Sequence, residues 1–205
     1  MYVPRHFAGD PALVDEIVAT HDFALLVTQG DHGPEATHLP LVLDRSRGGQ
    51  GVLLGHLARA NPHGDAIDGK PALAIFSGPH GYVSPRWYGA APAVPTWNYV
   101  AVHVHGRARI VREKERLLGL VDMLSRRYEA DGPWSVAGLP ERFRDGMIDG
   151  IVGLEIEVER IDTKFKLSQN RPPGDRRKVI EELERGDAGS VALAAAMRRF
   201  APAPD

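Results

Sequence analysis

Four short segments of this 205-residue chain gather side chains that could bind an anion or a planar ring. The first, at 55–62, reads Gly-His-Leu-Ala-Arg-Ala-Asn-Pro and brings imidazole, guanidinium and amide groups together after an apolar run. Charged donors make short and strong hydrogen bonds to phosphate oxygens. The segment is therefore a candidate phosphate site, although a solvated turn that follows a strand would show the same pattern.

Aromatic residues crowd into the second and third segments, at 81–88 and 94–99. They read Gly-Tyr-Val-Ser-Pro-Arg-Trp-Tyr and Val-Pro-Thr-Trp-Asn-Tyr, and together they hold two of the three tryptophans and three of the five tyrosines. Such rings can stack on a planar ligand or anchor a partner surface. They can equally form a small hydrophobic core under a long loop.

The fourth segment, at 164–172, reads Lys-Phe-Lys-Leu-Ser-Gln-Asn-Arg-Pro. Strand alternation would place Lys164, Lys166 and Ser168 on one face. Basic and amide groups there could reach an anion or the edge of a heteroaromatic ring. A solvated strand end is the alternative interpretation.

A metal site is the remaining candidate chemistry. His103 and His105 share one face of a predicted strand, about 7 Å apart by the rise of a strand, and His38 or His56 could add a third ligand. No Asp or Glu accompanies them at ligand spacing, and the chain has no Cys. We therefore predict no metal site and interpret these histidines as packed or interface residues.

The composition is that of an ordinary folded domain. Lys and Arg number 25 against 27 Asp and Glu, and 43% of the residues are hydrophobic. The absence of Cys excludes a disulfide framework, thiolate metal ligands and a thiol nucleophile. No apolar run approaches the ~20 residues of a membrane span, and the first residues lack the apolar core of a signal peptide. We expect a cytoplasmic protein without a membrane partner.

Short strands with turn-rich spacing, and helices between and after them, must position the four segments. Leu139-Pro140 opens a helix that runs through Met147-Ile148, and 77–97 is expected to be mostly irregular apart from a short strand around Tyr82-Val83. The pattern predicts a small β-barrel flanked by helices and argues against a doubly wound parallel sheet. The other predicted helices start at Asp10-Pro11 or cover 113–128, 175–184 and 187–200, and the predicted strands cover 23–28, 35–44 with Pro40 as an edge or bulge, 52–57, 72–76, 99–111 and 151–161.

The last two predicted helices resemble the outline of a helix-turn-helix. Residues 164–199 carry nine Lys and Arg against five Asp and Glu. The second of these helices is rich in Ala, however, and offers few side chains that could contact base edges. Its arginines, Arg198 and Arg199, come at the C-terminal end, whereas recognition helices use N-terminal residues. A packing or dimer helix is the favoured interpretation.

Five motifs in the same order resemble one known family. They are Met1-Tyr2-Val3-Pro4, the 55–62 segment, Tyr82 to Tyr88, Val94 to Tyr99 and Lys166 to Arg171. Together they resemble the PaiB family of FMN-binding negative transcriptional regulators. The resemblance implies an α+β split β-barrel of the FMN-binding, pyridoxamine-phosphate-oxidase-like kind, flanked by helices. It also implies a homodimer with FMN at the subunit interface, and DNA as a partner of the regulator.

Under this resemblance, residues 1–170 form the FMN-binding split barrel with inserted helices, and residues 171–200 form a C-terminal helical appendage. The phosphate of FMN would be bound by His56, Arg59 and Asn61, with Lys166 and Ser168 as second candidates. The flavin ring would lie along Leu57 and Ala58 and against Trp97. Its polar edge would meet Thr96, Asn98, Gln169 and Asn170, while Tyr82, Ser84 and Trp87 would shape the pocket.

Two other functions would suit the same fold. One is a flavin-dependent oxidoreductase similar to NAD(P)H:flavin reductases, since a flavin supplies its own redox chemistry. The other is a protein that binds haem through a histidine. The chain has no phosphate loop, no dinucleotide fingerprint and no Gly-x-Ser-x-Gly elbow, so no residue is assigned as catalytic and enzymatic activity stays open.

Overall fold

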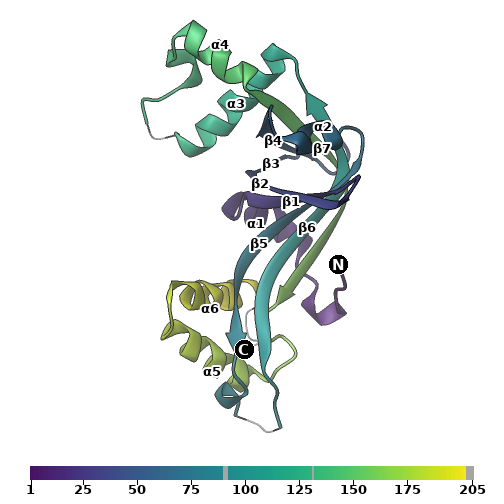
Figure 1. Ribbon diagram of the computed structural model, residues 1–205. Helices are drawn as coiled ribbons and strands as arrows, with labels where there is room; N and C mark the ends of the chain where they lie inside the picture. Colours follow the sequence, from purple (N-terminus) through teal and green to yellow (C-terminus); the bar gives the residue numbers. More distant parts are fainter. Residues whose placement is uncertain (90–91, 131, 202–205) are drawn as a thin grey trace. The chain divides into compact units, whose positions relative to one another are not determined.

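The computed structural model describes residues 1–89, 92–130 and 132–201, which cluster into two compact units (Figure 1). Unit 1 comprises Met1–Ile17, Phe76–His103 and the chain from Asp162 onward, and unit 2 comprises Val18–Ile75 and Val104–Ile161. Three long strands pass from one unit into the other.

Seven strands form one sheet, and each contributes residues to unit 2. The strand order is β2-β1-β5-β6-β7-β4-β3. The pairs β1–β2, β1–β5, β3–β4 and β4–β7 are antiparallel. The strands are β1 (Phe23–Gly30), β2 (Gly33–Pro40), β3 (Val42–Asp44), β4 (Val52–Ala58), β5 (Pro71–Val83), β6 (Thr96–Val111) and β7 (Ile151–Lys166).

The segment predicted as one strand at 35–44 is in fact two strands. The first, β2, pairs with β1 through a tight turn in which Gly30 faces Gly33, and Gly33 takes a φ of 130° that favours glycine. It ends at Pro40, which has no N–H for a ladder. The second, β3, pairs with β4 instead. The two pieces therefore lie at opposite ends of the strand order.

The prediction of mostly irregular structure across 77–97 was wrong for residues 77–81, because β5 runs on without a break to the strand predicted around Tyr82-Val83. Glycine allows this continuation at a close approach between strands. A Cβ on Gly78 would lie 2.9 Å from the Cβ of Val100 in β6. Part of the rest forms a 3-10 turn, η3 (Pro85–Trp87), and residues 90 and 91 of this stretch lie outside the described residues. Burial along β6 alternates as predicted.

The helices follow the predicted pattern closely. At the helix predicted to start at Asp10-Pro11, the Asp10 side chain accepts a hydrogen bond from the Ala12 N–H, as an N-cap should. Asn61-Pro62 opens the short helix α2, because the Asn61 side chain caps it. Besides η3, the helical elements are η1 (Arg5–Phe7), η2 (Pro11–Leu13), α1 (Val14–Thr20), α2 (Pro62–Ala66), α3 (Lys114–Tyr128), η4 (Val136–Gly138), α4 (Glu141–Asp149), α5 (Pro173–Glu184) and α6 (Ala188–Phe200).

The last helix, α6, is a packing helix, as its Ala-rich sequence predicts. Leu193, Ala194, Ala196 and Met197 are buried. At its C-terminal end the Arg199 guanidinium donates to the Glu16 carboxylate at 2.8 and 2.6 Å, which ties α6 to the N-terminal segment within unit 1. The domain boundary predicted near residue 170 stays a prediction. Within the described ranges, none of the helices has the length and apolar character needed to cross a bilayer.

A buried histidine joins α2 to the β1–β2 hairpin in unit 2. His63 is 3% exposed, and its two ring nitrogens share hydrogen bonds of 2.7 Å with the hydroxyls of Thr28 and Thr37. Burial lowers the pKa of His63, while the nearby Glu35 carboxylate acts in the opposite direction. The neutral imidazole is therefore the form that the fold favours.

We predict that the free energy of unfolding falls as pH drops below about 6.5, the ordinary pKa of histidine. A histidine whose folded pKa is lowered binds fewer protons in the folded state than in the unfolded state, so acid favours unfolding. His63→Gln should make this pH dependence shallower in denaturant titrations. His21 and His56, whose pKa values burial also lowers, should supply the remaining slope. An unchanged slope in the variant would contradict the assignment.

Candidate functional site

A small cavity in unit 1 brings together five of the residues predicted to bind a ligand. Its volume is about 180 Å³. The start of β6, the end of β7 and the turn after β7 all contribute to its wall. The lining residues are Phe7, Tyr88, Val94, Thr96, Asn98, Lys166, Ser168, Asn170 and Arg171.

The Lys166 ammonium lies at the wall of this cavity. Its Nζ donates to the Oγ1 of Thr96 and, at 2.7 Å, to the carbonyl oxygen of Trp97. The same atom lies 6.0 Å from the centroid of the Phe7 ring. Burial, with a smaller contribution from the Lys164 charge, lowers the pKa of Lys166. Because an ammonium has three N–H donors, one donor remains beyond these two hydrogen bonds.

Asn98 and Ser168 form the buried polar floor of the cavity. They are 1% and 3% exposed. The Asn98 Nδ2 donates to the Ser168 Oγ at 2.9 Å and approaches the Met197 Sδ at 3.5 Å. Sulfur is a weak acceptor, so this amide could make a stronger bond to a ligand oxygen.

Ser168 has a left-handed backbone, with φ of 65°. This conformation costs a residue other than glycine about 1–2 kcal/mol, and such strain is often retained at ligand sites. β7 ends at Lys166, so the prediction that Lys164, Lys166 and Ser168 share one strand face was wrong for Ser168. The serine reaches the cavity through the turn instead.

The turn that carries Ser168 is closed by Gln169. The Gln169 Oε1 accepts a hydrogen bond from the Leu167 N–H at 2.8 Å, and its Nε2 donates to the Phe165 carbonyl. The Gln169 amide was predicted to meet the edge of a flavin, but both of its polar atoms already form hydrogen bonds within this turn. Asn170, by contrast, is exposed and lines the cavity.

Arg171, Tyr88, Phe7 and Val94 line the cavity but were not predicted as site residues. The guanidinium carbon of Arg171 lies 4.5 Å from the centroid of the Tyr88 ring. Arg171 and Tyr88 end two of the motifs that drew our attention, so the motifs contained the signal. Spacing alone does not tell which residues of a motif face a cavity.

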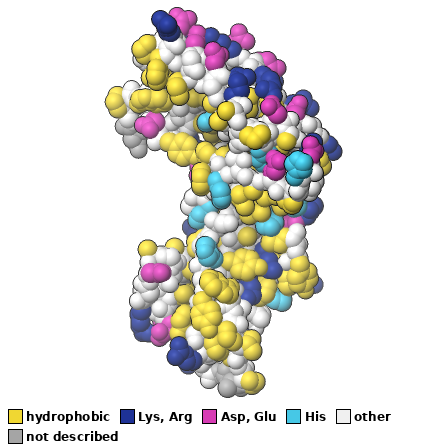
Figure 2. All heavy atoms as spheres, viewed as in Figure 1, with side chains coloured by type: hydrophobic (Ala, Val, Ile, Leu, Met, Phe, Trp, Pro, Cys, Tyr) yellow, Lys and Arg dark blue, Asp and Glu magenta, His cyan; other side chains and the backbone are white. Residues whose placement is uncertain are grey.

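The other aromatic predictions are divided between the surface and the interior of unit 1. Tyr82 and Trp97 are 44% and 55% exposed, and their rings meet edge to face with centroids 6.2 Å apart. Figure 2 shows hydrophobic side chains gathered on the surface over the ends of β5 and β6. Ser84 is buried and caps η3 by accepting from the Arg86 N–H, while Trp87 is half-buried.

The residues predicted around the end of β4 form a separate group in unit 2. The Nδ1 of His56 is buried and has no hydrogen-bond partner among the described residues, and burial lowers the pKa of this histidine. Arg59 is exposed and donates from Nε to the carbonyl oxygen of Asp149. Its terminal nitrogens extend beyond that bond and could reach an anion.

Three other predicted residues of this group have structural roles. The Asn61 Oδ1 accepts from the His63 N–H at 3.0 Å as the cap of α2. Leu57 and Ala58 are in register with Val152 and Ile151 in the β4–β7 ladder. Only one of these two, Ala58, is exposed. Contact between a ligand and the backbone at this point stays a prediction.

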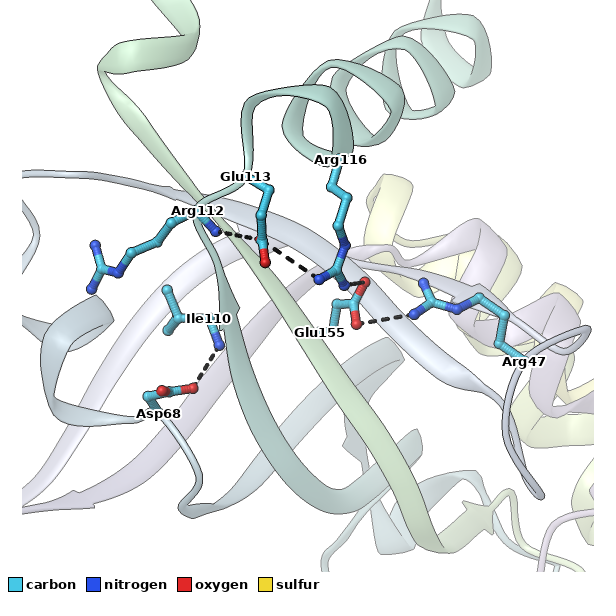
Figure 3. A network of polar contacts seen from close by, with 7 residues as sticks. All are labelled: Arg47, Asp68, Ile110, Arg112, Glu113, Arg116 and Glu155. Carbon is cyan, nitrogen blue, oxygen red and sulfur yellow. Dashed lines mark hydrogen bonds and ion pairs between the residues drawn. The ribbon is translucent and has the colours of Figure 1, made fainter.

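A third polar cluster, not singled out by the sequence, lies in unit 2 beside a cavity of about 480 Å³ (Figure 3). The Glu155 carboxylate accepts from Arg47 at 3.0 Å and from Arg116 at 2.9 Å. Asp68 accepts from the Ile110 N–H at 2.8 Å. Since its most buried carboxylate is already paired with two arginines, this cluster is a structural ion-pair network.

Comparison with known proteins identifies the family. The family described as "Putative FMN-binding domain" matches residues 1–160. The chain is 37% identical over 190 residues to "Protease synthase and sporulation protein PAI 2" of Bacillus subtilis, covering 90% of this chain and 89% of that protein. It is 32% identical over 188 residues to an uncharacterized protein of Emericella nidulans, covering 73% and 75% of the two chains. The chain therefore belongs to this FMN-binding family and is PaiB-like, and FMN is the cofactor of the family.

Solved structures confirm the fold class. The "FAD and Heme binding protein from Mycobacterium smegmatis" matches with a TM-score of 0.59 at 17% identity, covering 79% of this chain and 74% of that one. A conserved hypothetical protein from Mycobacterium tuberculosis matches with a TM-score of 0.58 at 17% identity, covering 84% and 94%. The fold is an α+β split β-barrel flanked by helices, as predicted.

The donor set of the unit 1 cavity fits part of FMN. The cofactor carries an anionic phosphate, a hydroxylated chain and a ring edge rich in acceptors. The cavity offers a lysine, an arginine, a hydroxyl and amides, and the buried Asn98 amide has only a thioether as its second partner. These residues would bind and orient acceptor groups of the cofactor, and the redox chemistry would belong to the bound flavin.

We predict that Asn98→Ala lowers the free energy of unfolding by about 1–3 kcal/mol, because it leaves the buried Ser168 hydroxyl without its partner. The exposed Asn170 of the same cavity is the matched control. Asn170→Ala should change stability by no more than about 0.5 kcal/mol. Equal effects of the two substitutions in urea titrations would contradict the assignment of Asn98 as the buried floor.

Proposed function

We propose that this protein is a cytoplasmic, homodimeric FMN-binding regulator that acts as a negative regulator of transcription. The observation that carries the proposal is the convergence of five predicted ligand contacts on one donor-rich cavity. Membership of the FMN-binding family supports the ligand. The regulatory role rests on the ordered motifs that resemble the PaiB family, and DNA is the partner that this role requires.

The size of the cavity supports a site completed by a second copy of the chain. A volume of about 180 Å³ is below the roughly 300–1,000 Å³ typical of a pocket that encloses a whole small ligand. Exposed Tyr82 and Trp97 next to the start of β6 offer apolar surface to a partner. A two-fold axis would then produce two flavin sites per dimer.

We predict a dimer by sedimentation at micromolar concentration and FMN in the freshly purified protein. The released ligand should be identified by its mass and by the absorbance of a flavin. A monomer that binds FMN fully would contradict the shared site. Release of haem instead of a flavin would favour the haem-binding alternative.

Arg59→Ala should weaken FMN binding by about 1.5–3 kcal/mol, the range for a hydrogen bond to a charged group. The prediction follows from the proposed contact between Arg59, with His56, and the phosphate. Arg126→Ala is the control, since Arg126 is an exposed arginine of α3 that pairs only with Asp122 among the described residues. Unchanged affinity of the Arg59 variant in fluorescence titration would remove the β4 end from the proposed site.

Two activity measurements separate regulation from catalysis. A regulator that binds DNA directly should shift upstream DNA in a gel at low salt, and the shift should be lost as salt is raised. A flavin-dependent oxidoreductase should instead oxidise NADPH steadily when FMN is added. No shift at low salt together with NADPH turnover would replace the regulatory proposal with the enzymatic one.

A further inference from the structure

We propose that His63 is a positioning residue for the phosphate site at the end of β4, and that it makes the affinity for FMN depend on pH. The inference rests on the proposed function, because it assumes that the phosphate is bound there by Arg59 and the residues predicted with it. It goes further by naming a buried side chain that would touch no ligand but control how those residues are presented.

Hydrogen bonds connect His63 to the turn that carries Arg59. The Asn61 Oδ1 accepts from the His63 N–H at 3.0 Å, which holds the Asn61 side chain at the start of α2. The Asn61 N–H donates to the Ala58 carbonyl at 2.9 Å and so closes the turn with Arg59 inside it. The Arg59 N–H donates to the Gly150 carbonyl at 2.8 Å. A shift of Asn61 would therefore change how Arg59 is held.

The hydrogen bonds around the imidazole define which ring nitrogen carries the hydrogen. The Asn61 Nδ2 donates to the Thr37 Oγ1 at 3.5 Å, so the Thr37 hydroxyl has its own hydrogen left for the His63 Nδ1 at 2.7 Å. Nδ1 is then the acceptor, and Nε2–H donates to the Thr28 Oγ1 at 2.7 Å. This chain of donors and acceptors is complete only with a neutral imidazole.

Protonation of Nδ1 would break one link of this chain. The hydrogen of the Thr37 hydroxyl would then face an N–H, so the hydroxyl would have to rotate and its bond from Asn61 would weaken. Asn61 would lose its second anchor, and the turn with Arg59 would be less well held. Because binding is strongest to donors that are already in place, the affinity for FMN should fall in acid.

The charged groups around His63 leave the balance between the two forms to burial. Glu35 of β2 favours the imidazolium, whereas burial opposes it more strongly and lowers the pKa of His63. Asp65 of α2 is exposed and paired with Arg112 at 2.8 Å. The contact from β1 is the neutral hydroxyl of Thr28.

The test compares wild type with His63→Gln from about pH 8 to about pH 5, on both sides of the ordinary pKa of histidine. The Gln amide offers a donor and an acceptor at every pH, so it can replace the neutral imidazole but cannot be protonated. Below the folded pKa of His63, wild type should lose FMN affinity relative to the variant, by up to about tenfold per pH unit. His56 and the phosphate titrate in both proteins, so the ratio of the two affinities isolates His63. Riboflavin, which lacks the phosphate, should show a constant ratio.

Two threonine variants test the route through Asn61. Thr37→Val removes the hydroxyl that joins the imidazole to Asn61, and at about pH 8 it should weaken FMN at least about threefold without changing riboflavin affinity. Thr28→Val is the matched control, because Thr28 bonds the other ring nitrogen. It should lower stability but keep the preference for FMN over riboflavin. If thermal unfolding shows that His63→Gln does not fold, Thr37→Val decides the proposal.

Each outcome bears on a different claim. A ratio of FMN affinities that stays constant across the pH range would overturn the role of His63 in the pH dependence. Tighter FMN binding by wild type than by His63→Gln in acid would also overturn it, because the imidazolium would then attract the phosphate directly. Equal losses for both flavins in Thr37→Val would overturn the positioning of the phosphate site. A wild-type protein that binds neither flavin at about pH 8 would overturn the proposed function itself.

Discussion

The site depends on one constraint, a lysine ammonium that is partly removed from water. None of the described residues that line the cavity supplies a carboxylate beside it. Lys166 is held by a hydroxyl and a carbonyl at the start of β6, and both are neutral acceptors. Its charge is therefore only partly compensated within the cavity, which the lowered pKa reflects. An anionic ligand would supply the missing partner, so the fold gives the site an electrostatic preference for anions.

The fold holds that ammonium in place through elements that are distant in sequence. β6 supplies the acceptors, the end of β7 supplies the lysine, and the strained turn at Ser168 brings a hydroxyl back toward β6. α6 adds Met197 beneath Asn98. Every one of these contacts lies within unit 1, so the cavity is a property of that unit.

Sequence patterns predicted the elements well where burial and local chemistry agree. Burial alternates along β6, where a strand was predicted. The helix predicted at 113–128 buries Leu117 and Leu124, while Leu120 and Val121 are half-buried. The pattern failed where a single residue has two compatible roles. Pro40 ended one strand and redirected the chain to another, and Asn61, predicted as a phosphate contact, caps a helix. Such outcomes depend on tertiary partners, which local spacing does not contain.

The site residues stay a prediction, but the structure shows which of them lie together. Thr96, Asn98 and Lys166 line one cavity, although Lys166 was predicted at the phosphate and the other two at the edge of the ring. Gln169 resembled a ligand contact because an amide donates equally well to a flavin and to its own turn. Arg171 was missed because stacking on Tyr88, 83 positions earlier in the chain, is visible only in three dimensions.

The strand β7 runs on past the last residue of the family match, which ends at 160. A shortened protein cut at that border would keep Trp97 and Arg59 but discard Lys166, the turn that follows it and the helix beneath Asn98. The boundary of the family match thus divides β7, and the last residue of this strand, Lys166, is a cation of the cavity wall. The isolated matched region would therefore lack four of the nine described residues that line the cavity.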